Sequence, residues 1–352
     1  MGDNPGVTAA GVTLADHDTM RAWVVRRPGP IDEAPLALAT LPVPAPGAGQ
    51  VRLAVRCCGV CRTDLHLAEG DLAPHHPGQT PGHEVVGVVE ALGPGAGRFA
   101  LGDRVGVPWL GGTDGNCRYC RSGRENLCLR PVFTGWDVAG GYAEHCVADE
   151  AFCYPLPAGL SDEQVAPLLC AGIIGYRALK VSGVQPGGRL AIYGFGGSAH
   201  LTAQIALGLG MRVHVLTRDE ASARLAEHLG VDSVAGPAEL PPEPVDGAIL
   251  FAPAGELVAP ALAGLDRGGT LAVAGIWLSD IERIRYTEQL FNERVLRSVT
   301  ANTRRDGEEF LRLAERYGVT ATTHQYPFTE ADRALADLKH GRFDGAAVLR
   351  MI

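Results

Sequence analysis

Three cysteines and one aspartate lie close together in the segment GGTDGNCRYCRSGRENLC, residues 111–128. Two residues separate Cys117 from Cys120, and Cys128 follows after seven more. A thiolate three places before Cys117 would complete a tetrahedral zinc cage, but that place holds Asp114. The spacing alone leaves three interpretations open: a metal site with one oxygen ligand, a site that has lost its metal, or a loop that contains cysteines.

A second set of possible metal ligands is spread over three segments of the chain. CGVCRTDLH offers Cys61, TPGHEVVG offers His83 and APLLCAGIIGY offers Cys170. Two thiolates and one imidazole leave the fourth position of a tetrahedral zinc ion open, as in catalytic sites. Such an ion lowers the pKa of an alcohol that binds at the open position. Cys58 and Cys61 also form a CxxC pair, but no thioredoxin-like context supports a redox role for it.

The segment LAIYGFGGSAHL has the pattern of a dinucleotide-binding turn. Gly194, Gly196 and Gly197 stand between a predicted strand and a predicted helix. This turn needs a backbone that can approach a pyrophosphate and free N–H groups at the start of a helix. Ala199 replaces the third glycine, which the pattern tolerates. We therefore expect a nicotinamide cofactor here, the alternative being a glycine-rich turn without a ligand.

The residues after the next predicted strand bear on the choice of cofactor. In NAD-binding proteins an acidic side chain at this place holds the adenosine ribose hydroxyls. Here Thr217 and Arg218 stand there, and both can donate to a 2′-phosphate that a carboxylate would repel. The pair favours NADP(H) over NAD(H). Asp219 and Glu220 follow directly and keep NAD(H) open.

Two kinds of secondary structure must position these residues. Residues 20–160 contain short β-type runs interrupted by glycine and proline, which indicate an antiparallel, barrel-like unit. From about residue 170 predicted strands and helices alternate, which indicates a parallel sheet with helices on both faces. After about residue 303, two predicted helices and a strand could rejoin the first unit. The expected fold class is therefore α/β, with a β unit and a doubly wound sheet.

Length, charge and cysteine use exclude several classes of protein. A chain of 352 residues is too long for one compact core, so two domains are expected. A net charge of −9 argues against nucleic acid and anionic membranes as partners. The first 18 residues lack the basic and apolar regions of a signal peptide, and we expect a cytoplasmic protein. Clustered cysteines in that compartment indicate metal binding or catalysis rather than disulfides.

Taken in order, these motifs resemble those of the zinc-dependent alcohol dehydrogenases of the medium-chain dehydrogenase/reductase superfamily. The resemblance covers roughly residues 20–352. It implies a GroES-like β-barrel catalytic domain, formed by residues 20–171 and 303–352. A Rossmann domain over residues 172–302 would be inserted between these parts. Residues 1–19 would be a polar, disordered leader.

The resemblance also implies roles for the residues of the first motifs. Cys61, His83 and Cys170 match the ligands of the catalytic zinc. Asp64 matches the carboxylate that orients the histidine ligand, a task that a neutral imidazole requires. Glu84 matches the acid that follows the histidine in the GHE motif, next to the metal ligands.

Further residues match the proton relay and the substrate cleft of the family. Thr63 and His66 match the relay that carries a proton from the alcohol, through the cofactor ribose, to solvent. Leu72, Trp109 and Leu110 match positions that line the cleft around the zinc. Leu72 in place of a bulkier aromatic side chain suggests room for alcohols larger than ethanol.

The family carries a second, structural zinc held by four cysteines, and the segment 111–128 matches its spacing. Cys117, Cys120 and Cys128 match the last three ligands, and Asp114 takes the first place. A carboxylate is a competent zinc ligand, although soft thiolates suit a closed structural site better. We therefore expect zinc here, bound more weakly than by four cysteines. The alternative is an empty lobe with three oxidisable thiols.

The resemblance implies hydride transfer between a nicotinamide cofactor and a primary or secondary alcohol, or the matching aldehyde or ketone. A polyol or sugar dehydrogenase of the same superfamily is an alternative, but such enzymes commonly carry glutamate where this chain has Cys170. A non-catalytic relative that kept only the fold is another, against which the complete ligand set counts. The resemblance also suggests a homodimer or a homotetramer.

Overall fold

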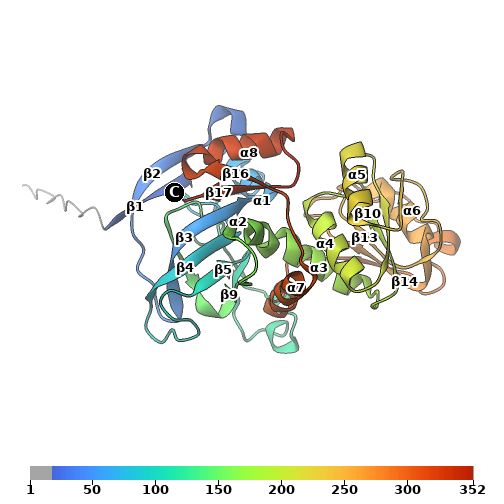
Figure 1. The fold of residues 1–352 in the computed structure, drawn as a ribbon, viewed down its shortest axis with the longest axis horizontal. Helices are drawn as coiled ribbons and strands as arrows, with labels where there is room; N and C mark the ends of the chain where they lie inside the picture. Colours follow the sequence, from blue (N-terminus) through green and yellow to red (C-terminus); the bar gives the residue numbers. More distant parts are fainter. Residues whose placement is uncertain (1–17, 352) are drawn as a thin grey trace, which may run out of the picture.

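The computed structural model describes residues 18–351, so the predicted polar leader lies almost entirely outside the described residues. The chain forms two units that lie side by side (Figure 1). One is built from the first and last parts of the chain, and the other from its middle. The domain boundaries expected from the sequence stay a prediction, although both terminal parts do share one sheet.

The first unit is mainly an antiparallel β structure. Its largest sheet has seven strands in the order β16-β17-β3-β4-β5-β9, with β8 paired to β3. The strands of this sheet are β3 (Gln50–Val60), β4 (Val85–Leu92), β5 (Arg104–Val107), β8 (His145–Asp149), β9 (Tyr154–Pro155), β16 (Thr323–Pro327) and β17 (Ala346–Arg350). Two small sheets flank it, made by β1 (Thr19–Val25) with β2 (Leu36–Pro42) and by β6 (Leu110–Gly112) with β7 (Val132–Phe133).

The second unit contains a parallel sheet of six strands in the order β12-β11-β10-β13-β14-β15. This order, in which the chain starts in the centre and winds outward twice, is that of a Rossmann sheet. Its strands are β10 (Arg189–Tyr193), β11 (Arg212–Leu216), β12 (Ser233–Ala235), β13 (Val245–Leu250), β14 (Leu265–Val273) and β15 (Val295–Ser298). The predicted fold class, a β unit with a doubly wound parallel sheet, is confirmed.

Eight α-helices and several short helices lie among the described residues. The α-helices are α1 (Arg62–Glu69), α2 (Asp162–Val165), α3 (Ala171–Ser182), α4 (Gly197–Gly208), α5 (Glu220–Leu229), α6 (Val258–Ala263), α7 (Arg304–Tyr317) and α8 (Ala331–His340). The short helices are η1 (Ile31–Glu33), η2 (Cys120–Ser122), η3 (Glu125–Leu127), η4 (Glu150–Phe152), η5 (Ala166–Leu169), η6 (Gly255–Leu257), η7 (Tyr286–Leu290) and η8 (Phe328–Glu330). Within residues 18–351 no single helix is long and apolar enough to cross a membrane. One bent pair, α2–η5 with α3, meets the test of length and composition when the two parts are taken together.

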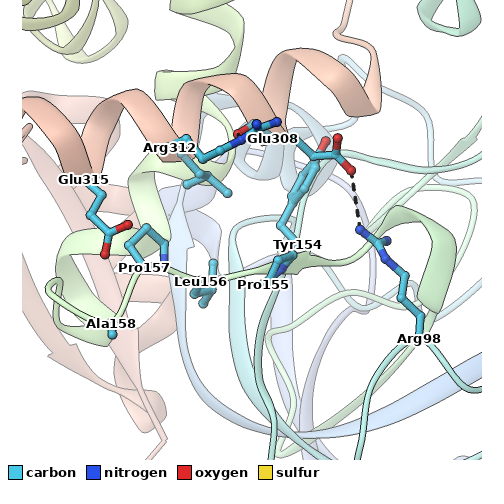
Figure 2. Close-up of a pocket in the computed structure, with 10 residues that line it drawn as sticks. Arg98, Tyr154, Pro155, Leu156, Pro157, Ala158, Glu308, Arg312 and Glu315 are labelled. Carbon is cyan, nitrogen blue, oxygen red and sulfur yellow. Dashed lines mark hydrogen bonds and ion pairs between the residues drawn. The ribbon is translucent and has the colours of Figure 1, made fainter.

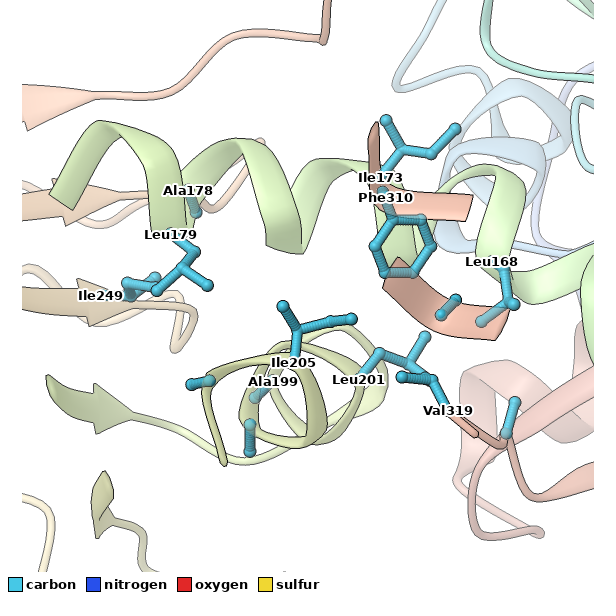
Figure 3. Close-up of a cluster of buried hydrophobic side chains, with 14 of the residues drawn as sticks. Leu168, Ile173, Ala178, Leu179, Ala199, Leu201, Ile205, Ile249, Phe310 and Val319 are labelled. Atoms are coloured by element: carbon cyan, nitrogen blue, oxygen red, sulfur yellow. The ribbon is translucent and has the colours of Figure 1, made fainter. Parts of the chain in front are cut away.

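A continuous hydrophobic core joins the two units where α3, α4 and α7 meet (Figure 3). Phe310 of α7 is fully buried and packs directly on Gly172 of α3. A Cβ atom at position 172 would lie 2.3 Å from the Phe310 ring, so only glycine fits there. The core therefore holds the start of α3 against α7, at the point where the chain passes from one unit to the other.

A hollow on the surface lies where α7 faces the segment 154–158 (Figure 2). It has a volume of about 380 Å³ and is bordered by the ion pair between Arg98 and Glu308, at 3.5 Å. Its lining includes none of the site residues predicted from the sequence. We assign it no function.

Candidate functional site

Three distant segments bring Cys61, His83 and Cys170 to one place. Cys61 follows β3 and caps the N-terminus of α1, His83 stands two residues before β4, and Cys170 caps the N-terminus of α3. Together with Glu84 their ligand atoms all lie within 4.8 Å of one another. The arrangement matches a tetrahedral zinc site made of two thiolates and an imidazole.

The His83 ring is held on one side and free on the other. Its Nδ1 lies 3.1 Å from Oδ1 of Asp64, and the same oxygen accepts the backbone N–H of Gly82 at 2.9 Å. The second oxygen, Oδ2, accepts the Cys61 backbone N–H at 3.0 Å and the Tyr142 hydroxyl at 3.4 Å. Both carboxylate oxygens of Asp64 are therefore hydrogen-bonded. The residue is buried, and it sets the orientation of the His83 ring.

The surroundings of the other ring nitrogen, Nε2, indicate that His83 can bind a metal ion. Nε2 is buried, and no described residue forms a hydrogen bond with it. A buried nitrogen without a partner costs free energy, and such groups are rare unless a ligand or ion satisfies them. Because both thiols lie within 4.8 Å of this ring, the donor set fits a zinc ion.

The electrostatics of the cluster favour a cation. The hydrogen bond from Cys170 is the main cause that lowers the pKa of the Cys61 thiol well below its usual range, and it raises that of Cys170. Burial raises the pKa of Glu84 well above that of a free glutamic acid. Gly59 makes room for this side chain, because a Cβ atom there would overlap the Glu84 carboxylate. A thiolate and a carboxyl group are thus held in a buried site next to an imidazole.

Thr63 and His66 lie on α1, beyond the cluster. Thr63 is buried, and its hydroxyl lies 3.8 Å from the Cys61 sulfur. His66 stands in the last turn of the helix, where its side chain is 38% exposed and touches Asp71. The buried Thr63 therefore lies next to the cluster, and the partly exposed His66 lies one turn further along α1.

The lobe around Asp114 brings its four predicted ligands together. The ligand atoms of Asp114, Cys117, Cys120 and Cys128 lie within 4.8 Å of one another. Asp114 Oδ1 accepts the backbone N–H groups of Asn116 and Cys117, at 3.0 and 2.9 Å. Backbone hydrogen bonds, that from Cys117 first, hold the pKa of the Asp114 carboxyl well below its usual range. Its carboxylate is therefore ionised and faces the three thiols.

The predicted cofactor turn joins β10 to α4. Gly194 has φ +83°, and a Cβ atom there would lie 2.8 Å from the Ala252 backbone nitrogen, so glycine is required. A Cβ atom at Gly196 or Gly197 would meet no atom within 4 Å. The backbone is therefore open to a ligand at the start of α4, where free N–H groups favour an anion.

Thr217 and Arg218 follow β11, directly beside this turn. The Gly194 N–H donates to the Leu216 carbonyl at 2.8 Å, which joins the two segments. Arg218 is exposed. Asp219, the alternative ribose-binding acid, caps α5 instead, accepting the Ser222 backbone N–H at 2.7 Å.

An aromatic layer that the sequence did not indicate adjoins the cluster of Cys61, His83 and Cys170. Trp109 lies edge-on to His83, with ring centroids 5.0 Å apart. It stacks on Phe133 at 4.7 Å and on Trp136 at 6.1 Å. Phe133 ends the short strand β7 and Trp136 lies in the turn that follows, and no periodicity in this part of the sequence indicated the contact.

The other two predicted cleft residues lie in different surroundings. Leu110 is buried in β6, with 1% of its surface exposed. Leu72 is half-buried, and its backbone N–H donates to the carbonyl of His66 at 3.0 Å. Leu72 is thereby tied to the end of α1.

Comparison with known proteins identifies close relatives. Residues 47–158 match the alcohol dehydrogenase GroES-like domain. The chain is 54% identical to the probable alcohol dehydrogenase AdhA of Mycobacterium tuberculosis, over 96% of this chain and 99% of that one. It is 36% identical to an alcohol dehydrogenase of Geobacillus stearothermophilus, over 90% of this chain and 96% of that one.

Solved structures show the same architecture. The structure of a cobalt- and zinc-bound thermostable alcohol dehydrogenase from Pyrobaculum aerophilum superposes with a TM-score of 0.84. The two chains are 26% identical, and the match covers 95% of this chain and all of that one. The GroES-like and Rossmann folds expected from the sequence are thus confirmed.

Proposed function

Because the chain belongs to the alcohol dehydrogenases of the medium-chain dehydrogenase/reductase superfamily, we propose that it oxidises alcohols with a zinc ion held by Cys61, His83 and Cys170. The observation that carries this proposal is the buried, unpartnered Nε2 of His83 beside two thiols. Zinc bound here would act as a Lewis acid and lower the pKa of an alcohol hydroxyl. The zinc named for the Pyrobaculum relative supports the assignment.

The surrounding residues have separate tasks in this proposal. Asp64 orients the ligand imidazole through Nδ1, and Glu84 is the buried acid next to the ligands. The buried Thr63 accepts the proton of the alcohol, and the partly exposed His66 passes it toward solvent. Together they remove the proton of the alcohol, and a bound nicotinamide would supply the hydride acceptor.

The test of the metal assignment is the replacement of a ligand. We expect Cys170→Ala to lose one zinc ion per chain and nearly all turnover, while the circular dichroism spectrum stays that of the folded protein. Cys153→Ala is the matched control, because that thiol is buried but lies outside both clusters. Near-normal turnover in a zinc-depleted Cys170→Ala protein would disprove the role of the metal.

We propose NADP(H) as the preferred cofactor. The open backbone at Gly196 and Gly197 would receive the pyrophosphate at the start of α4, behind the turn that Gly194 permits. Thr217 and Arg218 can donate to a 2′-phosphate, and the capping role of Asp219 leaves it less free to bind ribose hydroxyls. These contacts support NADP(H) over NAD(H).

We propose a second, structural zinc in the lobe formed by Asp114, Cys117, Cys120 and Cys128. The support is that the four ligand atoms already lie within 4.8 Å of one another, with the carboxylate ionised. Metal binding to such a preformed site is linked to the folding of the lobe.

The proposed substrate is a small alcohol, or the matching aldehyde or ketone. Trp109 next to His83 supplies an apolar wall beside the proposed zinc, and Leu72 and Leu110 match other cleft positions of the family. A flat aromatic wall suits substrates with an apolar body and one hydroxyl. A cytoplasmic location and a homodimer or homotetramer complete the proposal.

A further inference from the structure

The C-terminus of α1 places a carboxylate beside His66. The helix ends at Gly70, which has φ +93°, a conformation that glycine adopts without strain. The backbone N–H groups of Gly70 and Leu72 both donate to the His66 carbonyl, each at 3.0 Å. This turn folds the chain back over the last helical turn. Asp71 Oδ2 then lies 3.0 Å from Nδ1 of His66.

The other charged groups near the end of α1 are engaged elsewhere. Glu69 accepts the Lys339 ammonium at 2.6 Å and the Ile31 backbone N–H at 3.0 Å. Asp32 pairs with Nε2 of His340 at 3.0 Å. Among the described residues, Asp71 is therefore the carboxylate that holds His66.

A carboxylate on Nδ1 decides which nitrogen of a neutral imidazole carries the proton. Ionised aspartate only accepts hydrogen bonds, so the bond at 3.0 Å requires His66 to carry its proton on Nδ1. The lone pair then lies on Nε2. A neutral histidine can take up a proton only at the nitrogen that has the lone pair, and here that nitrogen is opposite the carboxylate.

We propose that Asp71 is a positioning residue that holds His66 in the tautomer, and in the ring orientation, in which Nε2 receives the proton of the substrate alcohol. This rests on the relay role proposed above for His66. The proton enters at Nε2 and makes an imidazolium ion, which the Asp71 carboxylate stabilises until a proton passes to water. Asp71 itself gains and loses nothing over the cycle.

The exposure of the pair sets the size of the effect. The side chains are 38% and 67% exposed, so water competes for both. We expect Asp71→Ala to reduce the rate of alcohol oxidation by about two- to fivefold, as the loss of an exposed charged pair permits. KM for the alcohol should stay unchanged, because Asp71 acts on proton removal rather than on substrate binding.

The tautomer can be measured directly, without turnover. In protein labelled with ¹⁵N-histidine, and at a pH where the imidazole is neutral, the wild-type spectrum should show His66 protonated on Nδ1. In water a neutral histidine side chain prefers the proton on Nε2, so Asp71→Ala should shift the population toward that form. Asp71→Asn should retain the wild-type tautomer, because its amide oxygen can still accept. An unchanged tautomer in Asp71→Ala would overturn the proposal.

A double-mutant cycle separates positioning from a structural role. Once His66→Ala has removed the imidazole, adding Asp71→Ala should have no further effect on kcat. Additive losses would mean that Asp71 acts elsewhere and would contradict the proposal. Asp32→Ala is the matched control, since it removes an exposed carboxylate from a different histidine, and it should leave kcat and the His66 signals unchanged. If His66→Ala alone left the rate unchanged, the relay would fail, while the NMR result would still decide whether Asp71 sets the tautomer.

Discussion

As a metal ligand, the Asp114 carboxylate carries the same charge as a cysteine thiolate, but its oxygen is a harder donor atom than sulfur. It offers one ionised oxygen to a group of three thiols, and two backbone N–H groups already hold that carboxylate in place. Oxygen ligands bind zinc, but a closed structural site made of thiolates binds it more tightly. We therefore expect the zinc affinity of the proposed second site to change when Asp114 is replaced.

We predict about two zinc ions per chain in protein purified without added metal, and about one in Asp114→Ala. Asp114→Cys should restore the second ion and raise the melting temperature, because metal that binds only the folded lobe stabilises it. Metal analysis and thermal unfolding measure both effects. A wild-type content near one ion, unchanged in Asp114→Ala, would show that the lobe binds no metal.

Arg218 and Thr217 give the cofactor proposal a test at single residues. Arg218→Ala should weaken NADP(H) binding by about tenfold or more and leave NAD(H) binding nearly unchanged, because only NADP(H) carries the 2′-phosphate. Thr217→Asp should move the preference toward NAD(H) by adding repulsion to that phosphate. Fluorescence titration with both cofactors gives the ratio. A wild-type preference for NAD(H) would refute the proposal.

At the scale of elements, an ion pair ties the lobe of Asp114 to the start of α7. Glu125, in η3, accepts the backbone N–H of Arg304 at 2.7 Å and its guanidinium at 2.7 and 3.1 Å. The side-chain amide of Asn126 donates to the Thr300 carbonyl at 2.9 Å, in the segment that leads into α7. Since α7 packs on α3, whose cap is Cys170, this contact connects the two proposed metal sites.

We predict that Glu125→Gln lowers the free energy of unfolding by about 1.5 kcal/mol at pH 7, since a charged, partly buried hydrogen bond is lost. Burial alone would raise the pKa of Glu125, but the hydrogen bonds from Arg304 lower it below its usual range. A lowered folded pKa stabilises the fold above the unfolded value of about 4.3, and this contribution disappears as the pH falls through the folded pKa. Denaturant unfolding should therefore show the variant and the wild type converging in acid.

The control for this prediction lies on the same helix. Glu308 of α7 forms an exposed ion pair with Arg98 at 3.5 Å, visible in Figure 2. Glu308→Gln should change stability by no more than about 0.5 kcal/mol, because exposed pairs contribute little. Equal losses in both variants, or a Glu125→Gln loss that does not depend on pH, would contradict the assigned strength of the Glu125 contact.

At the scale of the whole molecule, β15 leaves one side of the parallel sheet open. It is the last strand in the order, and no described residue pairs with its outer edge. Several apolar side chains of the preceding segment and of the strand itself are exposed, namely Ile276, Trp277, Ile281, Tyr286, Phe291 and Val295. An open strand edge beside an apolar surface favours pairing with another chain, and a two-fold axis would pair two copies of β15 antiparallel.

We predict that Tyr286→Glu combined with Phe291→Glu lowers the mass of the proposed homo-oligomer, since charges in this surface oppose its burial. Sedimentation equilibrium measures the mass. Leu101→Glu is the control, because Leu101 is equally exposed, at 64%, but belongs to the other unit. Assembly that survives the double substitution would place the interface on another surface.

Local patterns of residues were sufficient to predict a large part of this protein. The glycine turn at Gly194, the alternation of strands and helices after residue 170 and the cluster of Cys117, Cys120 and Cys128 all depend on residue type and short spacing. Each of these features is a local requirement: a positive φ, a period of side-chain burial, or a donor atom that a metal needs. Such requirements can therefore be recognised from the residue types of a short segment.

Contacts between distant segments were decided only by the tertiary structure. Glu125 and Arg304 are 179 residues apart, and no pattern in the sequence near either residue predicts their contact. The stacking of Trp109 on Phe133 and Trp136 has the same cause, because no period or motif in the sequence marks an aromatic contact between these two segments. The unpartnered nitrogen of His83 is likewise a property of the packed site, since burial of Nε2 follows from the side chains that surround it. The sequence specified which groups are available, and the folding of the chain decided which of them meet.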